Sequence, residues 1–541
     1  MSPLDEHILT GSLQELRPEH DTAVGLIHPY WARKPLNIVQ ELVTRFSEEG
    51  DLVADPFVGS GTTVFAALSK NRRVVGADLN PLAIFITRAI TSLCESPRHK
   101  LATAKRFVED FSNAVLPWFH YRDDLYVERE RFRVDGVFEG GNFELIPLEV
   151  VLKSFQAGKP QGRRTELPSK EWTSRNLYQP HVSLPLDFQK LLLTPNSRIA
   201  IPSGASLNHY YEPKNQAAIN LALDLIQSNR YQADDVEILQ LMLSAALPLL
   251  RLSDKKASSQ WPYWRPKDQL TSRNPVLVMK KKLAAIERAA VWLEENISDV
   301  VNKHPSDYLQ LYTSPVQSLV PDYIAPEQVD LVLTDPPYSD QAPYLEYSSL
   351  WIQLLGLSLP EGAYGYEIVK TDAPERVMDS QQYVARLGEG LKSCARLLKL
   401  NGILIWFYQD RLVKHWAMLS EEAAQNGLRI VDVVPLEKQR RSMKTVTSPG
   451  KTLDGDLVLV FRKESQVVGG GGQQQSMPQA LRILGQALEG LPKSSSYFEK
   501  YAAIINSGLK NNLMIPLASE FLDIKEVLRA IDHGDNHVLA A

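Results

Sequence analysis

Short apolar segments recur along the chain, and segments with helical signals separate them. Each has the length and composition of a buried β-strand. They are LVADP (52–56), VVGAD (74–78), DLVLTD (330–335), GILIWFYQ (402–409), IVDVVPLE (430–437) and DLVLVFRK (456–463). Apolar strands that alternate with helices are typical of an open, mostly parallel sheet with helices on both faces. The sequence therefore predicts an α/β fold built on such a sheet.

One long segment interrupts this rhythm. From about Glu95 to Gln310 the chain is rich in proline and irregular, and then has helical patterns around 216–250 and 279–297. Val467–Pro478 is rich in glycine and glutamine, which is typical of a flexible linker. We therefore predict five regions. They are the first part of the α/β domain (25–95), an inserted region (96–305), the second part of the α/β domain (306–464), a linker (465–478) and a small helical C-terminal module (479–541).

Composition limits the function classes. The 541 residues are 44% hydrophobic and 23% charged, which is typical of a globular protein with two or three domains. We expect a cytoplasmic protein without membrane contact, because no apolar run approaches a membrane span and the polar N-terminus lacks a signal-peptide pattern. Cys94 and Cys394 stand alone in the sequence, so we expect neither a metal site nor a disulfide framework. With a net charge of −5, a nucleic-acid partner requires a local basic face.

The segment Asp55-Pro-Phe-Val-Gly-Ser-Gly-Thr-Thr63 lies between the first strand and a predicted helix. Gly59 and Gly61 permit a tight turn and close approach of a ligand to the backbone. The helix N-terminus offers amide donors that suit a carboxylate. Asp78 ends the next strand, where an acid can accept hydrogen bonds from both hydroxyls of a ribose. A lone G-x-G also occurs in structural turns and in nicotinamide-binding folds, but Val64 replaces the third glycine of the latter.

The most specific segment is Thr334-Asp335-Pro336-Pro337-Tyr338, at the end of the strand predicted over 330–335. Ligands of open α/β sheets bind at that edge. Two successive prolines fix φ and disfavour a helix at the preceding residue. The chain therefore leaves the strand as a short extended arm (335–338, the DPPY arm) with a carboxylate, a free carbonyl and an aromatic ring. The alternative, a proline turn that only ends a strand, is disfavoured, because chance gives this word in roughly a few per thousand chains of this length.

The DPPY arm suits methyl transfer to a base amine. An exocyclic amine is a poor nucleophile because its lone pair is delocalised into the ring. Two acceptors that hold its two N–H bonds favour a pyramidal nitrogen and expose the lone pair to a sulfonium methyl group. Asp335 would stabilise the positive charge that develops on nitrogen, and the Tyr338 ring would hold the base in line. A base in a duplex cannot reach such a pocket, so it must be flipped out.

These segments resemble the hallmarks D-P-F-x-G-S-G-T-T and D-P-P-Y of the amino-group-specific DNA methyltransferases. His28-Pro-Tyr-Trp-Ala-Arg-Lys-Pro35 is similar to the H-P-x-x-K-P element of that family, and a predicted helix over Leu36–Phe46 follows it. The resemblance covers roughly residues 25–95 and 305–463. It implies a Rossmann-like methyltransferase sheet, S-adenosylmethionine as cofactor and DNA as partner.

The resemblance also implies roles for individual residues. Lys34 would line the methionine end of the cofactor pocket, and Asp78 would hold the ribose with Asn80 nearby. The residues around the methionine moiety would be Asp55, Pro56, Phe57, Gly59, Gly61 and Thr62. The catalytic residues would be Asp335, Pro336 through its carbonyl, Pro337 and Tyr338.

The resemblance leaves the base and the activity partly open. Ser314 stands where many relatives have an acid, so the adenine contact of the cofactor is not assigned. Relatives that act on cytosine N4 more often have serine in the first position of the catalytic word, so Asp335 favours adenine N6. The alternatives are a cytosine-N4 or RNA adenine methyltransferase, or a non-catalytic DNA-binding subunit of a modification or defence complex. The intact DPPY word argues against the last, and an aspartate rather than asparagine disfavours a protein-glutamine methyltransferase.

Two basic clusters are candidates for DNA contacts. From Arg251 to Arg288 the chain has ten Lys/Arg and three Asp/Glu, and the second cluster is Lys438-Gln-Arg-Arg-Ser-Met-Lys444. Basic residues interleaved with aromatic ones suit phosphate contacts and stacking, whereas a solvated helix face at 280–282 is the alternative for the first cluster. The candidates are Trp261, Trp264, Arg265, Lys267, Arg440 and Arg441. No nuclease or Walker pattern is evident, so cleavage would need partner subunits, and the C-terminal module would either dock one or cap the main body.

Overall fold

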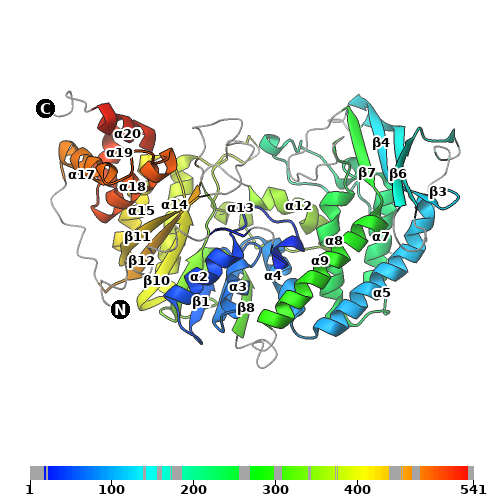
Figure 1. Cartoon of the computed structure of the whole chain (residues 1–541), viewed down its shortest axis with the longest axis horizontal. Helices are drawn as coiled ribbons and strands as arrows, with labels where there is room; N and C mark the ends of the chain where they lie inside the picture. The colour runs from blue at the N-terminus through cyan, green and yellow to red at the C-terminus, as the bar shows by residue number, and fades with distance from the viewer. Residues whose placement is uncertain are drawn as a thin grey trace.

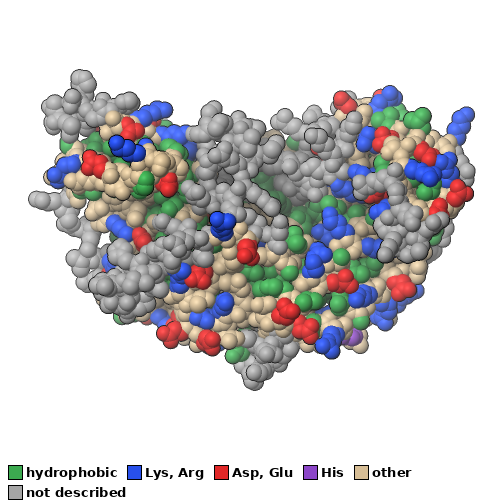
Figure 2. Space-filling view, viewed as in Figure 1, with side chains coloured by type: hydrophobic (Ala, Val, Ile, Leu, Met, Phe, Trp, Pro, Cys, Tyr) green, Lys and Arg blue, Asp and Glu red, His purple; other side chains and the backbone are tan. Residues whose placement is uncertain are grey.

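The computed structural model of the chain has its largest sheet between helices near the C-terminus at one end and a second, smaller sheet at the other (Figure 1). The residues that it describes are 17–19, 22–137, 142–154, 161–170, 172, 186–254, 268–297, 308–338, 343–371, 373–374, 376–437, 453, 455–465 and 475–533. Figure 2 shows that the face seen here is hollowed along one edge between the two ends, with basic and acidic side chains interspersed on it.

The largest sheet contains seven strands in the order β11-β12-β10-β9-β1-β2-β8. Neighbouring strands are parallel except at β12, which runs antiparallel to β10 and β11. The strands are β1 (Leu52–Asp55), β2 (Arg73–Asp78), β8 (Leu309–Thr313), β9 (Val329–Thr334), β10 (Leu398–Tyr408), β11 (Leu428–Glu437) and β12 (Gly455–Lys463). The prediction of a mixed α/β fold with a mostly parallel sheet is confirmed. The sequence analysis missed only β8, whose exposed and half-buried side chains give no apolar run.

Side chains on successive strand positions enter two separate cores, one on each face of the sheet. Leu331 and Leu333 of β9 belong to one core, and Val332 belongs to the other. The helices on the first face are α2 (Leu36–Phe46), α3 (Thr62–Leu68), α4 (Pro81–Ser92) and α12 (Tyr344–Leu355). Those on the opposite face are α14 (Ser380–Leu397) and α15 (Val413–Gln425). The central strands are apolar throughout because both of their faces are covered.

A second sheet and four long helices lie between α4 and β8 in the sequence. The sheet is antiparallel, with the order β3-β4-β5-β6 and with β7 paired to β4. Its strands are β3 (His120–Arg122), β4 (Leu125–Val137), β5 (Asn142–Ser154), β6 (Gln161–Glu166) and β7 (Gln269–Arg273). The helices are α5 (Pro97–Val115), α7 (Pro213–Gln227), α8 (Ala233–Leu250) and α9 (Pro275–Asn296).

The helical patterns predicted around 216–250 and 279–297 are confirmed by α7, α8 and α9. The description of the preceding part as irregular is wrong for β4 and β5, which are long strands. β4 contains the run ERERFR (128–133), in which charged residues occupy both faces, so it lacks the alternation of a half-buried strand. Pairing with β5 on one side and β7 on the other stabilises β4. A cross-strand ion pair adds to this, with Arg131 Nη1 3.0 Å from Glu149 Oε2.

Within the described residues 475–533, four helices follow β12, namely α17 (Met477–Glu489), α18 (Tyr497–Lys510), α19 (Met514–Glu520) and α20 (Ile524–His533). Their apolar side chains, such as Tyr501 and Leu517, join the same core as β12 and α15. Short helical turns complete the described chain at η2 (Val24–Leu26), η3 (Leu116–Phe119), η6 (Ser197–Ile199), η7 (Leu207–His209), η8 (Val316–Ser318) and α13 (Ala363–Tyr366). Within the described ranges, every helix is too short or too polar to cross a membrane.

Candidate active site

A pocket opens at the carboxyl ends of β1, β2 and β9, where the strand order of the sheet reverses direction. The empty space within it is about 930 Å³, and part of this space is continuous with bulk solvent. Both predicted motifs contribute to its lining, together with residues 30–34, the turn at 315–317 and the loop at 366–368. The pocket therefore lies where ligands of open α/β sheets bind.

Two glycines shape the turn between β1 and α3. Gly59 and Gly61 have φ values of 52° and 83°, in the left-handed region that favours glycine. A Cβ on Gly61 would lie 2.8 Å from the Thr87 hydroxyl oxygen, so the close packing of α4 requires glycine at this position. Gly59 lines the pocket and Gly61 does not. Gly61 therefore shapes the turn rather than the pocket wall.

The Asp78 carboxylate lies at the end of β2 and holds this turn in place. Its Oδ2 accepts a hydrogen bond from the Gly59 amide at 2.9 Å, and its Oδ1 accepts one from the Asn80 amide at 2.9 Å. Burial raises the pKa of Asp78 to about 7, although the two backbone hydrogen bonds lower it. A carboxylate can accept about four hydrogen bonds. Asp78 lines the pocket and thus has capacity for two further donors, such as the hydroxyls of a ribose.

Asp55 connects the two predicted motifs. Its Oδ1 accepts hydrogen bonds from the Thr334 hydroxyl at 2.6 Å and from the Phe57 amide at 3.1 Å. Burial raises the pKa of Asp55 to about 6, whereas these hydrogen bonds lower it. Thr334 ends β9 directly before the DPPY arm, so Asp55 both lines the pocket and positions the arm.

The remaining predicted cofactor residues also line the pocket. They are Lys34, Pro56, Phe57, Thr62 and Asn80. The Asn80 side chain has structural tasks as well. Its Oδ1 accepts the Leu82 amide at 3.1 Å and caps α4, while its Nδ2 donates to the Ser348 hydroxyl of α12 at 2.7 Å. Asn80 therefore joins two helices beside the pocket.

The Lys34 ammonium contacts the DPPY arm. Its Nζ lies 3.0 Å from Asp335 Oδ2 and 3.2 Å from Asp456 Oδ2, and it donates a hydrogen bond to the Tyr338 hydroxyl at 2.9 Å. It also lies 5.0 Å from the centroid of the Tyr338 ring and 5.4 Å from that of Phe407. Burial alone would lower the pKa of Lys34, but the two carboxylates raise it above its usual value. We call Lys34, Asp335 and Asp456 the Lys34 cluster.

Asp335 has one occupied and one open oxygen. Its Oδ2 faces Lys34, whereas its buried Oδ1 has no hydrogen-bond partner among the residues that the structure describes. Burial raises the pKa of Asp335 to about 6, Lys34 lowers it and Asp456 raises it. A buried acceptor without a donor costs about 1–3 kcal/mol. The Oδ1 atom is therefore an unused acceptor, which a donor from a ligand reaches only when the atoms that cover it move.

The rest of the DPPY arm is tightly packed. Tyr338 is 6% exposed, and its ring meets Tyr408 edge-on with the centroids 5.8 Å apart. The Tyr383 hydroxyl donates a hydrogen bond to the Pro337 carbonyl at 3.1 Å. Asp335 and Pro337 line the pocket, but Pro336 and Tyr338 do not. The structure thus brings the carboxylate to the pocket and places the Tyr338 hydroxyl against the Lys34 ammonium.

Asp456 is a site residue that the sequence analysis missed. It belongs to β12, next to the Gly455 that begins this strand, and it binds Lys34. Because β12 runs antiparallel to β10, it begins at the edge where the parallel strands end. An acid directly before the apolar run 457–461 was the available signal in the sequence.

The H-P-x-x-K-P element packs against both motifs, a role that its sequence alone did not indicate. Arg33 donates hydrogen bonds to the Ser60 hydroxyl at 2.8 Å and to the His28 carbonyl at 2.9 Å, which ties the element to the glycine turn. The Tyr30 ring stacks on Tyr344 of α12, with the centroids 6.2 Å apart and the planes at 17°. Both rings line the pocket and give it an aromatic wall.

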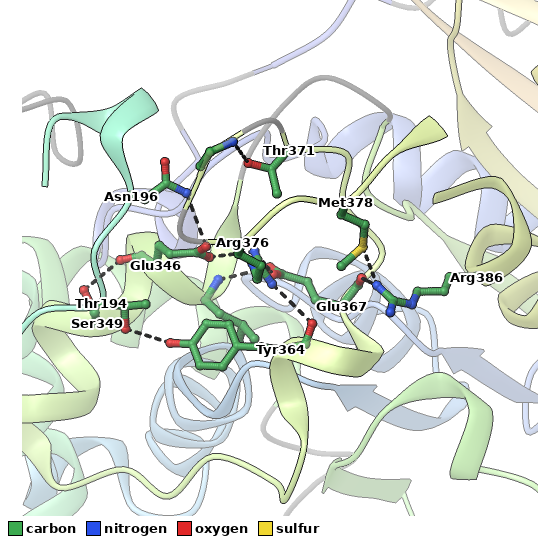
Figure 3. Close-up of polar contacts among 12 residues, drawn as sticks. Thr194, Asn196, Glu346, Ser349, Tyr364, Glu367, Thr371, Arg376, Met378 and Arg386 are labelled. Atoms are coloured by element: carbon green, nitrogen blue, oxygen red, sulfur yellow. Dashed lines mark hydrogen bonds and ion pairs between the residues drawn. The ribbon is translucent and has the colours of Figure 1, made fainter. Parts of the chain in front are cut away.

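A second group of charged side chains lies beside the pocket (Figure 3). Arg376 Nη2 lies 2.9 Å from Glu346 Oε2 and 2.6 Å from Glu367 Oε2. The Asn196 side chain donates to Glu346 Oε1 at 3.2 Å, and Glu367 Oε1 accepts the Leu345 amide at 3.1 Å. We call Arg376, Glu346 and Glu367 the Arg376 cluster. It joins the loop at 366–368, which lines the pocket, to α12 and to the chain that follows β6.

The residues predicted to contact DNA all lie outside the described residues. They are Trp261, Trp264, Arg265, Lys267, Arg440 and Arg441. Three described basic residues of the first cluster have packing contacts instead. Arg273 donates to the Leu249 carbonyl at 3.1 Å, and Lys282 donates to the Ile27 carbonyl at 3.2 Å. Arg251 is buried, and burial lowers its pKa to about 10.

Comparison with known proteins finds a matching family and several similar methyltransferases. Residues 12–87 match the N6/N4 DNA methylase family. Over 359 residues the chain is 21% identical to the Type II methyltransferase M.MjaII of Methanocaldococcus jannaschii. The aligned region covers 61% of this chain and 62% of that protein. A segment of 49 residues is 45% identical to the Type II methyltransferase M.HindIII of Haemophilus influenzae, covering 9% of this chain and 16% of that protein. The chain thus spans less than two thirds of the length of these relatives.

Proposed function

We propose that the chain is an amino-group-specific DNA methyltransferase, like the family that residues 12–87 match, and that it transfers a methyl group from S-adenosylmethionine to an exocyclic amine of a base in DNA. The proposed base is adenine, at N6, within a specific site and flipped out of the duplex. The matched family and the Type II methyltransferases among the relatives support methylation of DNA. Adenine is favoured by Asp335, since relatives that act on cytosine N4 more often have serine at this position.

The observation on which the proposal depends is the Lys34 cluster. There a protonated nitrogen lies 3.0 Å from the Asp335 carboxylate and donates to the Tyr338 hydroxyl, 5.0 Å from the centroid of its ring. A base amine that has just accepted a methyl group is also a cationic nitrogen beside an aromatic ring. Carboxylate and ring both stabilise such a cation. The arrangement therefore supports a DPPY arm that stabilises the charge that develops on the target amine.

The target amine would be held by two acceptors. The Asp335 Oδ1 atom, which has no partner within the described chain, would accept a hydrogen bond from one N–H group of the amine. The Pro336 carbonyl would accept a hydrogen bond from the other N–H group. With both N–H bonds held, the nitrogen becomes pyramidal and its lone pair points away from the ring. Tyr338 would stack on the base after its buried ring becomes exposed to the pocket as the base enters. The Tyr30 and Tyr344 rings, which form the aromatic wall, would exclude water from the pocket.

The pocket fits S-adenosylmethionine by the chemistry of its donors and acceptors. Asp78 offers acceptors for the ribose hydroxyls, and Gly59 lets the backbone approach the ligand closely. The further residues that we propose around the cofactor are Lys34, Asp55, Pro56, Phe57, Thr62 and Asn80. Gly61 would act through the shape of the turn. The cofactor supplies a methyl group on a positively charged sulfur, which leaves as a neutral thioether.

The proposal extends to the other regions of the chain. We propose that the region 96–305 recognises the target sequence and that the two basic clusters contact the DNA backbone. Residues 255–267 of the first cluster and all of the second lie outside the described residues. Cleavage of unmodified DNA, if the protein serves a restriction-modification system, would be the task of separate subunits. The helices after 479 are the proposed contact region for such a partner.

The direct test is transfer of a labelled methyl group. The purified chain is incubated separately with DNA and with RNA in the presence of methyl-labelled S-adenosylmethionine, and the digested nucleosides are identified by mass spectrometry. Label in N6-methyladenine supports the proposal. Label in N4-methylcytosine would contradict the assigned base, and label in RNA alone would contradict the assigned substrate. Cofactor binding without transfer to any nucleic acid would indicate a non-catalytic subunit instead.

A further inference from the structure

A chain of buried polar side chains starts at the back of the DPPY arm. The Pro337 carbonyl accepts a hydrogen bond from the Tyr383 hydroxyl of α14 at 3.1 Å. The Tyr383 hydroxyl lies 3.3 Å from the hydroxyl of Tyr408 at the end of β10, and Tyr408 donates to Asp410 Oδ2 at 3.2 Å. Tyr383 and Tyr408 have no exposed surface, and Asp410 is 6% exposed. The arm is therefore connected to Asp410 through the interior of the protein.

Asp410 is the residue at which several elements meet. Its Oδ2 lies 2.6 Å from His415 Nδ1, and its Oδ1 accepts the Leu412 amide at 2.9 Å. Its carbonyl accepts hydrogen bonds from the Trp416 indole at 2.9 Å and from the Tyr501 hydroxyl at 2.7 Å. Tyr501 belongs to α18. A helix of the C-terminal region therefore binds Asp410, the last member of this row of buried polar side chains.

The backbone after Asp410 is also fixed to the C-terminal helices. The Val413 amide donates to the Leu522 carbonyl at 3.1 Å, and the Ile524 amide donates to the Arg411 carbonyl at 2.9 Å. Leu522 lies in the segment that joins α19 to α20, and Ile524 is the first residue of α20. Residues 410–413 are thus held at two places by the C-terminal helices.

The number of available protons determines which group donates each hydrogen bond in this chain of buried side chains. Burial raises the pKa values of Tyr383, Tyr408 and Tyr501 well above the usual value, so each hydroxyl keeps its single proton. The Pro337 carbonyl can only accept, so Tyr383 donates to it. Tyr408 then donates its proton either to the Tyr383 oxygen or to the Asp410 carboxylate. Loss of any member leaves a buried polar group without a partner, and such networks lose more than the sum of their separate contacts.

We propose that Tyr383, Tyr408, Asp410 and Tyr501 are positioning residues that set the DPPY arm for methyl transfer, so that the C-terminal helices serve the active site. This inference rests on the proposed function, because it takes the task of the arm from it. Pro337 directly follows the carbonyl of Pro336, the proposed second acceptor. A small rotation of the Pro337 peptide therefore moves that acceptor relative to Asp335. Tyr408 also packs edge-on against Tyr338, which links the ring of the arm to the same chain.

The test compares two substitutions on the same helix. Tyr501→Phe removes the hydroxyl that binds Asp410, whereas Tyr497→Phe removes a hydroxyl that has no hydrogen-bond partner among the described residues. At saturating DNA and cofactor, Tyr501→Phe and Tyr383→Phe should lower the single-turnover rate of methyl transfer by about 10- to 100-fold, as small misplacements of reacting groups do. The rate of Tyr497→Phe should stay within about twofold of the parent. Cofactor affinity, measured by calorimetry, should be similar in all three variants.

A second readout does not depend on methyl transfer. Amide hydrogen exchange, measured by mass spectrometry on a peptide that contains Asp335 and Tyr338, should be faster in Tyr501→Phe and Tyr383→Phe than in Tyr497→Phe. If the parent transfers no methyl group, the proposed function fails, and the exchange rates still decide whether the helices hold the arm. Equal exchange in this peptide for the Tyr501 and Tyr497 variants would overturn the inference. If Tyr501→Phe does not fold, Tyr383→Phe against Tyr497→Phe gives the same decision.

Discussion

Two clusters in this molecule have the same charges, one cation between two carboxylates, but different geometry. In the Lys34 cluster the ammonium lies 3.0 Å from Asp335 and 3.2 Å from Asp456. In the Arg376 cluster the guanidinium lies 2.9 Å from Glu346 and 2.6 Å from Glu367. Arginine has five donors in a rigid plane, which suits two carboxylates at once, whereas lysine is a compact charge on a flexible stem.

The two clusters also differ in whether all of their carboxylates have hydrogen-bond donors. Glu346 and Glu367 have side-chain exposures of 1% and 5%, and each has a further donor besides Arg376. Asp335 has a side-chain exposure of 26%, and its Oδ1 has no partner in the described part of the chain. The Arg376 cluster thus resembles a structural support, and the Lys34 cluster has an open acceptor at a pocket. Buried charge alone does not indicate a catalytic group, whereas an unsatisfied acceptor beside a pocket does.

Removal of the cation from the Arg376 cluster should have the largest effect. Arg376→Met keeps much of the side-chain volume but leaves two buried carboxylates without a cation. The free energy of unfolding should fall by about 3–5 kcal/mol, the usual cost of breaking a buried ion pair. Urea denaturation measures this, with Lys34→Met as the matched variant. Lys34→Met should be less destabilising, because Asp335 is partly exposed and takes up a proton near pH 6. Equal losses would show that both clusters are structural.

Two acids that line the pocket should differ in their effect on cofactor binding. Asp78→Ala should weaken S-adenosylmethionine binding by about 1–3 kcal/mol, because it removes charge-assisted hydrogen bonds to the ribose. Glu367→Gln should change the affinity less, since Glu367 already binds Arg376 and the Leu345 amide. Calorimetry measures both affinities. Unchanged affinity in Asp78→Ala would exclude Asp78 from the cofactor site.

The smallest expected effect is a shift in the pH dependence of transfer. The pKa of Asp335 is raised to about 6, so its protonated form persists to that pH and the single-turnover rate should fall as pH decreases through it. Lys34 lowers this pKa and Asp456 raises it. Lys34→Met should therefore move the decline to higher pH, and Asp456→Asn should move it to lower pH. Shifts in the same direction in both variants would contradict the assignment to Asp335.

The sequence predicts the parts of the molecule in which local pattern and tertiary structure agree. β1, β2 and β9 were recognisable because they are buried on both faces and therefore apolar. Asp55, Asp78 and Asp335 could be identified as pocket residues because each ends or directly follows such a strand at the edge where ligands bind.

Other parts depend on contacts between distant segments and have no local signal. Lys34 and Tyr338 are 304 residues apart in the sequence. The family resemblance therefore predicted that Lys34 lines the pocket, but it did not predict its contact with the DPPY arm. Glu346 and Glu367 read as ordinary surface charges, because their burial depends on Arg376 and Asn196. β4 remained unrecognised because its charged run is stabilised by pairing on both sides rather than by an apolar face.

The central claim is that Asp335 stabilises positive charge on the target amine, and one rate tests it most directly. Asp335→Asn preserves the shape of the side chain and one acceptor oxygen but removes the negative charge. The single-turnover rate of methyl transfer, with DNA and cofactor prebound, should fall by about 100- to 1,000-fold. DNA affinity should stay similar, because contacts made before the reaction largely remain. A rate within a few-fold of the parent at unchanged DNA affinity would contradict the claim.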